Sequence, residues 1–218
     1  MKHFFIALLC ITASCTKKVS PITAATKTPT DTLTYSTANT LTITGDFDGD
    51  GKQDILNQLL ADSTGRPIDK VRDHETWEET VNYYSKQGYY TAVVINHKPA
   101  DILTFSNSQG LYCLINVGDL NNDKRDEIAL VPDSMDFSRH NYCHIYSFCP
   151  SGWKDVFSFS VHEDAFDYMG DTLPVFTNIP QALEYRNSEW YFYDYLDMQY
   201  KTEEDVGKML PLIVAPCN

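Results

Sequence analysis

A twelve-residue pattern rich in aspartate occurs twice, and it restricts what the chain can fold into more than any other feature does. The first copy, GDFDGDGKQDIL, spans residues 45–56; the second, GDLNNDKRDEIA, spans residues 118–129 and aligns with it without a gap. The first copy places four aspartates within nine positions, where charges of like sign repel one another strongly. A bound cation would offset this repulsion, so the pattern predicts a metal-binding loop.

The spacing of the oxygen-bearing residues fits a hard cation. Side-chain oxygens at loop positions 1, 3, 5 and 9, together with the backbone carbonyl of position 7, can surround a single ion. The expected side-chain ligands are Asp46, Asp48, Asp50 and Asp54 in the first loop and Asp119, Asn121, Asp123 and Glu127 in the second, with backbone carbonyls from Lys52 and Arg125. A ligand set made only of oxygen favours Ca²⁺, because Mg²⁺ prefers a smaller and more hydrated octahedron.

An EF-hand shares the first ligand positions, but it also needs a bidentate glutamate at position 12 and flanking helices. Position 12 is Asn57 in one loop and Leu130 in the other, and both lie in strand-like sequence. The two loops instead resemble the calcium loops of FG-GAP and VCBS repeats, found in integrin-like β-propellers and in many secreted bacterial proteins. This resemblance implies that each loop joins two strands of one blade and that its metal ion is structural.

The two loops are not equivalent. Gly49 and Gly51 allow the first loop to turn tightly with positive φ. The second loop has Asn122 and Lys124 at these positions, and lysine adopts the left-handed conformation at a cost of about 1 kcal/mol or more. The second loop also has one carboxylate fewer, because Asn121 replaces an aspartate. We therefore expect it to bind Ca²⁺ more weakly or not at all; acidic turns without metal are the alternative for both loops.

From residue 41 onward, short runs rich in β-branched and aromatic residues alternate with turn residues. One stretch, residues 69–88, lacks this alternation and predicts a short helix that ends near Gly88. Without that insertion the loops recur about every 50 residues, close to one propeller blade, so residues 41–218 hold roughly three units, two of them with a recognisable repeat. Because a closed propeller needs at least four blades, we predict a mainly β fold: a partial propeller-like or sandwich-like assembly of antiparallel sheets with calcium-binding loops and one short inserted helix.

The first residues predict export. MKHFFIALLCITASC has Lys2, an apolar run and small residues before Cys15, which is typical of a secretory signal. Its end resembles a bacterial lipobox, and the whole start is similar to that of Bacteroidetes lipoproteins. The resemblance implies a signal peptide at 1–14, a lipidated Cys15 and an outer-membrane anchor, with the face of the membrane left open. Residues 15–40, rich in threonine, would form a tether; an ordinary signal peptide with a chance cysteine is the alternative.

Export also bears on the cysteines of the β domain, which are Cys113, Cys143, Cys149 and Cys217. Cys143 and Cys149 lie six residues apart in one strand-like run, a distance of about 20 Å when extended, so they should not pair with each other. We expect Cys113 to pair with one of them and Cys217 with the other. Buried free thiols are the alternative.

The net charge and the absence of catalytic motifs limit the classes of function that the chain can have. A net charge of −13 argues against binding nucleic acid through its phosphates and fits a cation or a basic partner. No HExxH, GxSxG, P-loop or GxGxxG motif is present. We therefore predict a calcium-stabilised cell-envelope lipoprotein with a non-enzymatic binding role toward a protein or glycan ligand. An immunity-type inhibitor of a basic toxin, or a hydrolase of envelope or other glycans, are the alternatives.

Overall fold

The computed structural model describes residues 33–168, 171–172, 174–198 and 207–217. The predicted signal peptide, Cys15 and the larger part of the predicted tether lie outside the described residues. Within the described part of the chain, no helix is long and apolar enough to cross a bilayer.

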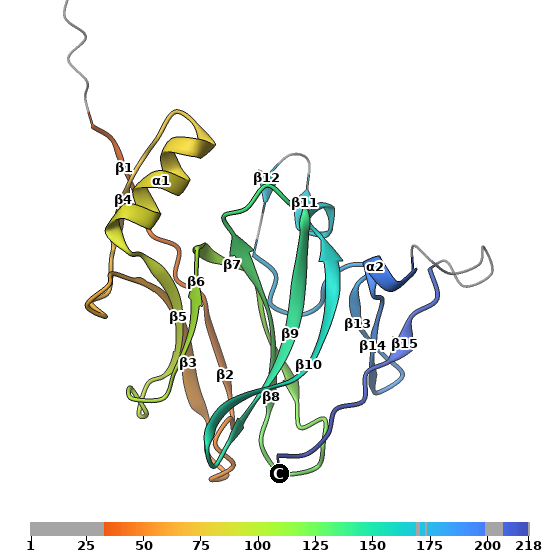
Figure 1. The fold of residues 1–218 in the computed structure, drawn as a ribbon. Coiled ribbons are helices and arrows are strands. Elements are labelled where there is room, and N and C mark those ends of the chain that lie inside the picture. The colour runs from red at the N-terminus through yellow and green to blue at the C-terminus, as the bar shows by residue number, and fades with distance from the viewer. Residues whose placement is uncertain (1–32, 169–170, 173, 199–206, 218) are drawn as a thin grey trace, which may run out of the picture. The chain divides into compact units, whose positions relative to one another are not determined.

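Two four-stranded antiparallel sheets form the larger part of the fold (Figure 1). The strands of the first sheet, in spatial order, are β2 (Thr42–Gly45), β3 (Asp54–Ala61), β5 (Tyr90–Ile95) and β6 (Ile102–Ser106). The strands of the second sheet are β7 (Ser108–Gly118), β8 (Glu127–Ser134), β9 (His140–Cys149) and β10 (Gly152–His162). In both sheets, the strands lie side by side in the order in which they occur along the chain.

The two acidic loops occupy the same place in the two sheets. The first joins β2 to β3, and the last pair of that ladder is Gly45 opposite Asp54. The second joins β7 to β8, where Gly118 lies opposite Glu127. Each acidic loop therefore joins an edge strand of its sheet to the next strand.

Smaller elements complete the fold. A third sheet contains β13 (Leu183–Arg186), β14 (Glu189–Phe192) and β15 (Leu210–Pro211). Two-stranded ladders pair β1 (Tyr35–Thr37) with β4 (Lys70–Arg72) and β11 (Asp167–Tyr168) with β12 (Asp171–Thr172); the remaining helical turns are η1 (Glu163–Ala165) and α2 (Tyr195–Met198). The described residues form antiparallel sheets without a closed barrel, which confirms the predicted mainly β fold class of a partial propeller or sandwich.

The second sheet packs on both of its faces. Toward the first sheet it contributes Leu114, Ile128 and Leu130, and toward the third it contributes Ile115 and Ala129. Adjacent residues of a strand point to opposite faces, so a strand covered on both sides is apolar at consecutive positions. This explains why the first six residues of β8 are all buried.

The predicted helix is α1 (Trp77–Gln87), inserted between β3 and β5. The hydroxyl of Thr76 caps its start by accepting the N–H of Glu79, and Gly88 ends it with a left-handed φ of 65°. Its buried Tyr84 packs in a small apolar cluster that includes Leu60. The stretch from 69 to 88 thus holds the expected helix, and it also holds β4.

One disulfide joins the end of β9 to the C-terminal segment. Cys149 and Cys217 are bonded, with their Cα atoms 5.6 Å apart, whereas Cys113 and Cys143 are buried free thiols. The prediction that Cys217 pairs with one of the two β9 cysteines is confirmed, and the predicted pairing of Cys113 is wrong. Cys113 lies on β7 and Cys143 on β9, and β8 separates the two strands by about 10 Å, which exceeds the disulfide limit of about 7 Å.

Replacing Cys149 and Cys217 together by alanine should lower the free energy of unfolding by about 4 kcal/mol, because the crosslink joins positions 68 apart and restricts the unfolded chain. Urea denaturation followed by tryptophan fluorescence, with and without reductant, measures this. The Cys113→Ala variant keeps the crosslink and should still respond to reductant, whereas the double variant should not. If reductant left the unfolding midpoint of the wild-type protein unchanged, the assignment of the Cys149–Cys217 disulfide would be contradicted.

Candidate metal centre

The backbone N–H groups of the first loop point inward and donate to the loop's own carboxylates. Asp46 accepts from Gly49 at 3.0 Å and from Gly51 at 2.9 Å. The other carboxylates accept in these pairs: Asp48 from Asp50 (3.0 Å), Asp50 from Lys52 (2.8 Å) and Asp54 from Phe47 (3.0 Å). Hydrogen bonds to ionised oxygens are stronger than those between neutral groups, so they partly offset the repulsion between the carboxylates.

The second loop repeats most of this pattern, except that Asp119 Oδ1 accepts from the N–H of Asp123 and not from that of Asn122, the equivalent of Gly49. Asp119 accepts from the N–H of Lys124 at 2.9 Å, as Asp46 accepts from Gly51. The remaining equivalent pairs are Asn121 with Asp123 (2.9 Å), Asp123 with Arg125 (3.0 Å) and Glu127 with Leu120 (2.7 Å). The two segments therefore follow one backbone course, which the sequence alignment alone could only propose.

The backbone angles agree with this equivalence. Gly49 and Gly51 have φ values of 77° and 83°, and Asn122 and Lys124 have values of 62° and 71°. Lys124 thus adopts the left-handed conformation that usually costs a residue with a Cβ about 1 kcal/mol or more. The second loop keeps the course of the first despite this cost.

In the first loop the predicted side chains converge. One carboxylate oxygen from each of Asp46, Asp48 and Asp50 lies within 4.8 Å of the others, and Asp48 and Asp54 form a second such group with His97. Asp48 belongs to both groups, so the four predicted carboxylates form two overlapping clusters that share this residue. This arrangement of acidic side chains can bind a metal ion.

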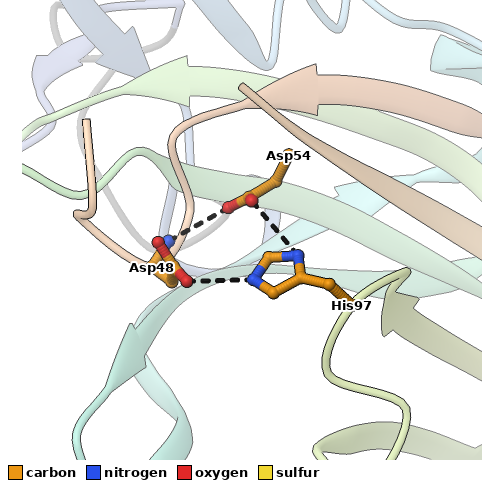
Figure 2. Close-up of side chains that lie close together, drawn as sticks. All are labelled: Asp48, Asp54 and His97. Atoms are coloured by element: carbon orange, nitrogen blue, oxygen red, sulfur yellow. Dashed lines mark hydrogen bonds and ion pairs between the residues drawn. The ribbon is translucent and has the colours of Figure 1, made fainter. Parts of the chain in front are cut away.

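His97 is a member of the site that the sequence analysis did not identify. It lies in the turn between β5 and β6, with Nε2 3.0 Å from Asp48 Oδ2 and Nδ1 3.4 Å from Asp54 Oδ1 (Figure 2). Lys98 Nζ approaches the same Asp48 oxygen at 3.4 Å. Donor groups of the protein therefore lie against the carboxylates that a cation would contact. No spacing rule connects His97 to the loop, because the sheet alone brings the two turns together.

The environments of these carboxylates differ. Burial alone would raise the pKa of Asp48, but hydrogen bonds from His97, from the N–H of Asp50 and from Lys98 together lower it. Burial raises the pKa of Asp54, and the neighbouring charge of Asp48 raises it further. A cation beside Asp54 would offset both effects.

In the second loop, side chains of the protein itself contact the carboxylate of Glu127. The amide of Asn121 donates to Glu127 Oε1 at 2.8 Å, and the hydroxyl of Ser147 donates to the same oxygen at 2.9 Å. Burial raises the pKa of Glu127 to about 7, and the charges of Asp123 and Asp119 contribute. Asp119, Asp123 and Glu127 do not form a convergent group of the kind found among the described residues of the first loop.

The residues at position 7 of the two loops, Lys52 and Arg125, form ion pairs within their own loops. Lys52 Nζ lies 2.9 Å from Asp50 Oδ2, and Arg125 Nη1 lies 3.2 Å from Asp123 Oδ2. Each basic side chain thus pairs with the acidic residue two positions before it. The use of their carbonyl oxygens as ligands stays a prediction.

The two loops contact each other directly. Asp126 Oδ2 accepts the N–H of Asp46 at 3.1 Å, and the N–H of Asp126 donates to the carbonyl of Asp46 at 2.8 Å. Asn116 Nδ2 donates to Asp126 Oδ2 at 2.8 Å and to the carbonyl of Thr44 at 3.0 Å. Asp126 is a second residue that the sequence did not single out, because the first loop has Gln53 at the equivalent position. The contact ties the first sheet to the second at this end.

No protein-family model, curated protein or solved structure matches the chain. The resemblance of the two loops to those of FG-GAP and VCBS repeats therefore stays a prediction from the sequence.

Gly45→Ala should destabilise the protein, since a Cβ there would lie less than 3.0 Å from the side chains of Asn116, Asp126 and Phe47. We expect a loss of about 1–3 kcal/mol in the free energy of unfolding, measured by urea denaturation. Gly110→Ala is the matched control, because its Cβ would meet nothing within 4 Å. Equal stability of the two variants would show that the loops do not lie against each other as described.

Proposed function

We propose that the chain is an exported, calcium-stabilised binding protein of the bacterial cell envelope that does not catalyse a reaction. The observation that carries this proposal is the pair of overlapping clusters in the first loop, Asp46 with Asp48 and Asp50, and Asp48 with Asp54 and His97. Much of the hydrogen-bond pattern of this loop recurs in a second sheet. Oxygen ligands in a loop that also supplies backbone carbonyls suit Ca²⁺ better than a softer metal. Such a metal acts on the fold rather than on a substrate.

The ion would bind between the carboxylates that His97 and Lys98 now contact, and these two side chains would move away. The carbonyl and N–H of Asp46 hold Asp126 of the second sheet. An ion that fixes Asp46 therefore also fixes the contact between the two sheets. This explains how a metal in a surface loop would stabilise the whole β domain.

Two features support export and anchoring. The signal-like residues 1–14 precede Cys15, whose lipidation would anchor the chain in the outer membrane, with residues 16–40 as tether. The bond between Cys149 and Cys217 is of the kind that persists in oxidising compartments outside the cytoplasm.

The net charge of −13 bears on the ligand, because it favours a basic partner over nucleic acid.

Calcium should raise the melting temperature measured by calorimetry, because an ion that binds only the native state stabilises it. The gain is about 2.7 kcal/mol when the free ion exceeds Kd a hundredfold. Asp46→Asn should remove most of this gain, whereas Asp119→Asn should remove little. Magnesium at the same concentration should give a smaller shift.

If neither calcium nor chelator changed the melting temperature, the proposal would be overturned. If Asp119→Asn removed the calcium response and Asp46→Asn kept it, the second loop and not the first would be the main calcium site.

A further inference from the structure

A second group of polar and charged side chains lies at the other end of the second sheet. The acidic loop follows Gly118 at the end of β7, whereas Gln109 and Tyr112 lie near the start of that strand, beside the end of β8. A hollow of about 310 Å³ opens there. Its described lining residues come from α1, β7, β8, the turn after β8 and η1: Trp77, Gln109, Tyr112, Asp133, Ser134, Asp136, Phe137, Ser138, Arg139 and Glu163.

Two carboxylates in this hollow act on one hydroxyl group. Burial raises the pKa of the Tyr112 phenol, and the nearby charges of Asp133 and Glu163 raise it further. The ring of Tyr112 stacks on Phe166, with centroids 5.0 Å apart and planes 10° apart, which fixes the position of the hydroxyl.

Neutral amides provide the next contacts. Gln109 Nε2 donates to Asp133 Oδ2 at 2.9 Å, and Asn141 Nδ2 donates to Glu163 Oε1 at 3.3 Å. These groups bring hydrogen bonds without a positive charge. The two carboxylates therefore depend on other groups for charge compensation.

That compensation is incomplete. Arg139 is the one basic side chain among the described residues of the lining, which also include the carboxylates of Asp133, Asp136 and Glu163. Its Nη2 pairs with the exposed Asp164 outside the lining, and its Nε forms a longer ion pair, of 3.9 Å, with Glu163 Oε2. Burial raises the pKa of Asp133, and the charge of Glu163 raises it further. One basic side chain thus faces three carboxylates in the lining.

The lining of the hollow also includes aromatic rings. Phe137, in the turn after β8, is 83% exposed, and Trp77 of α1 is partly buried. An aromatic face attracts a cation, and it also packs against the apolar stem of a lysine or arginine side chain. The aromatic and the acidic residues of the lining therefore favour the same kind of group.

We propose that this hollow binds a basic side chain, with its guanidinium or ammonium group, from a partner protein. A guanidinium presents several N–H donors in a plane and can reach two acceptors at once. Sugar hydroxyls would fill the space but would leave the charge deficit. The inference rests on the proposed binding role and names the partner class, but it does not depend on calcium occupancy.

Titration of the purified protein with N-acetyl-arginine amide, followed by NMR shift changes, tests the proposal. N-acetyl-citrulline amide has nearly the same shape without the charge, and we expect it to bind at least about tenfold more weakly. Asp133→Asn and Glu163→Gln should each weaken arginine binding about tenfold. Glu75→Gln is the matched control, because it removes an exposed charge near Trp77 outside the lining and should leave binding unchanged.

Equal binding of the arginine and citrulline probes would overturn the proposal. So would a failure of the arginine probe to shift any signal at millimolar concentration, or arginine binding that survives both carboxylate variants when each melts as the wild type does. Saturable binding of a neutral oligosaccharide that both variants abolish would assign the hollow to a glycan instead. Each titration is run with calcium and with chelator on samples of known melting temperature, so loss of arginine binding is separated from loss of the calcium effect.

Discussion

The mutual repulsion of carboxylates in the first acidic loop is the constraint on which the rest of the structure depends. Three kinds of group oppose it within the protein: the N–H groups of the loop, the imidazole of His97 and the ammonium of Lys98. Hydrogen bonds to carboxylates favour their ionised form, so the loop can form while keeping its charge. The same oxygens remain arranged around a region that a cation would fill.

The loop matters beyond its own residues because it lies against the second sheet. The N–H of Asp46 donates to the carboxylate of Asp126, and the carbonyl of Asp46 accepts the N–H of Asp126. Arg125 Nε also donates to the carbonyl of Asp48, at 3.3 Å. Behind these polar contacts the two sheets share an apolar core that contains Phe47, a residue of the loop itself. Charge neutralisation in the loop and packing of the sheets are therefore parts of one arrangement.

Much of the local structure could be read from the sequence, because it depends on neighbouring residues. The acidic loops, the end of α1 at Gly88 and the turn from Cys149 to Gly152 follow from spacing, glycine positions and turn composition. The roles of His97 and Asp126 could not be read in this way, since each reaches the first loop from a segment that only the sheet topology brings near.

The error over Cys113 has the same origin. The sequence places Cys113 and Cys143 in strand-like runs but does not give the order of the strands. With β8 between β7 and β9, the two thiols are buried in the same core without being bonded. The carboxylate-lined hollow at the other end of the second sheet could not be predicted either, because its described residues come from four separate segments of the chain.

The most direct measurement is a crystal structure of the protein grown with calcium, in which anomalous scattering locates the ion. The account predicts one ion in the first loop, bound by oxygens of Asp46, Asp48, Asp50 and Asp54 at about 2.3–2.6 Å, with the imidazole of His97 moved away from Asp48. A calcium-grown crystal with no ion in this loop, and with His97 still between Asp48 and Asp54, would contradict it.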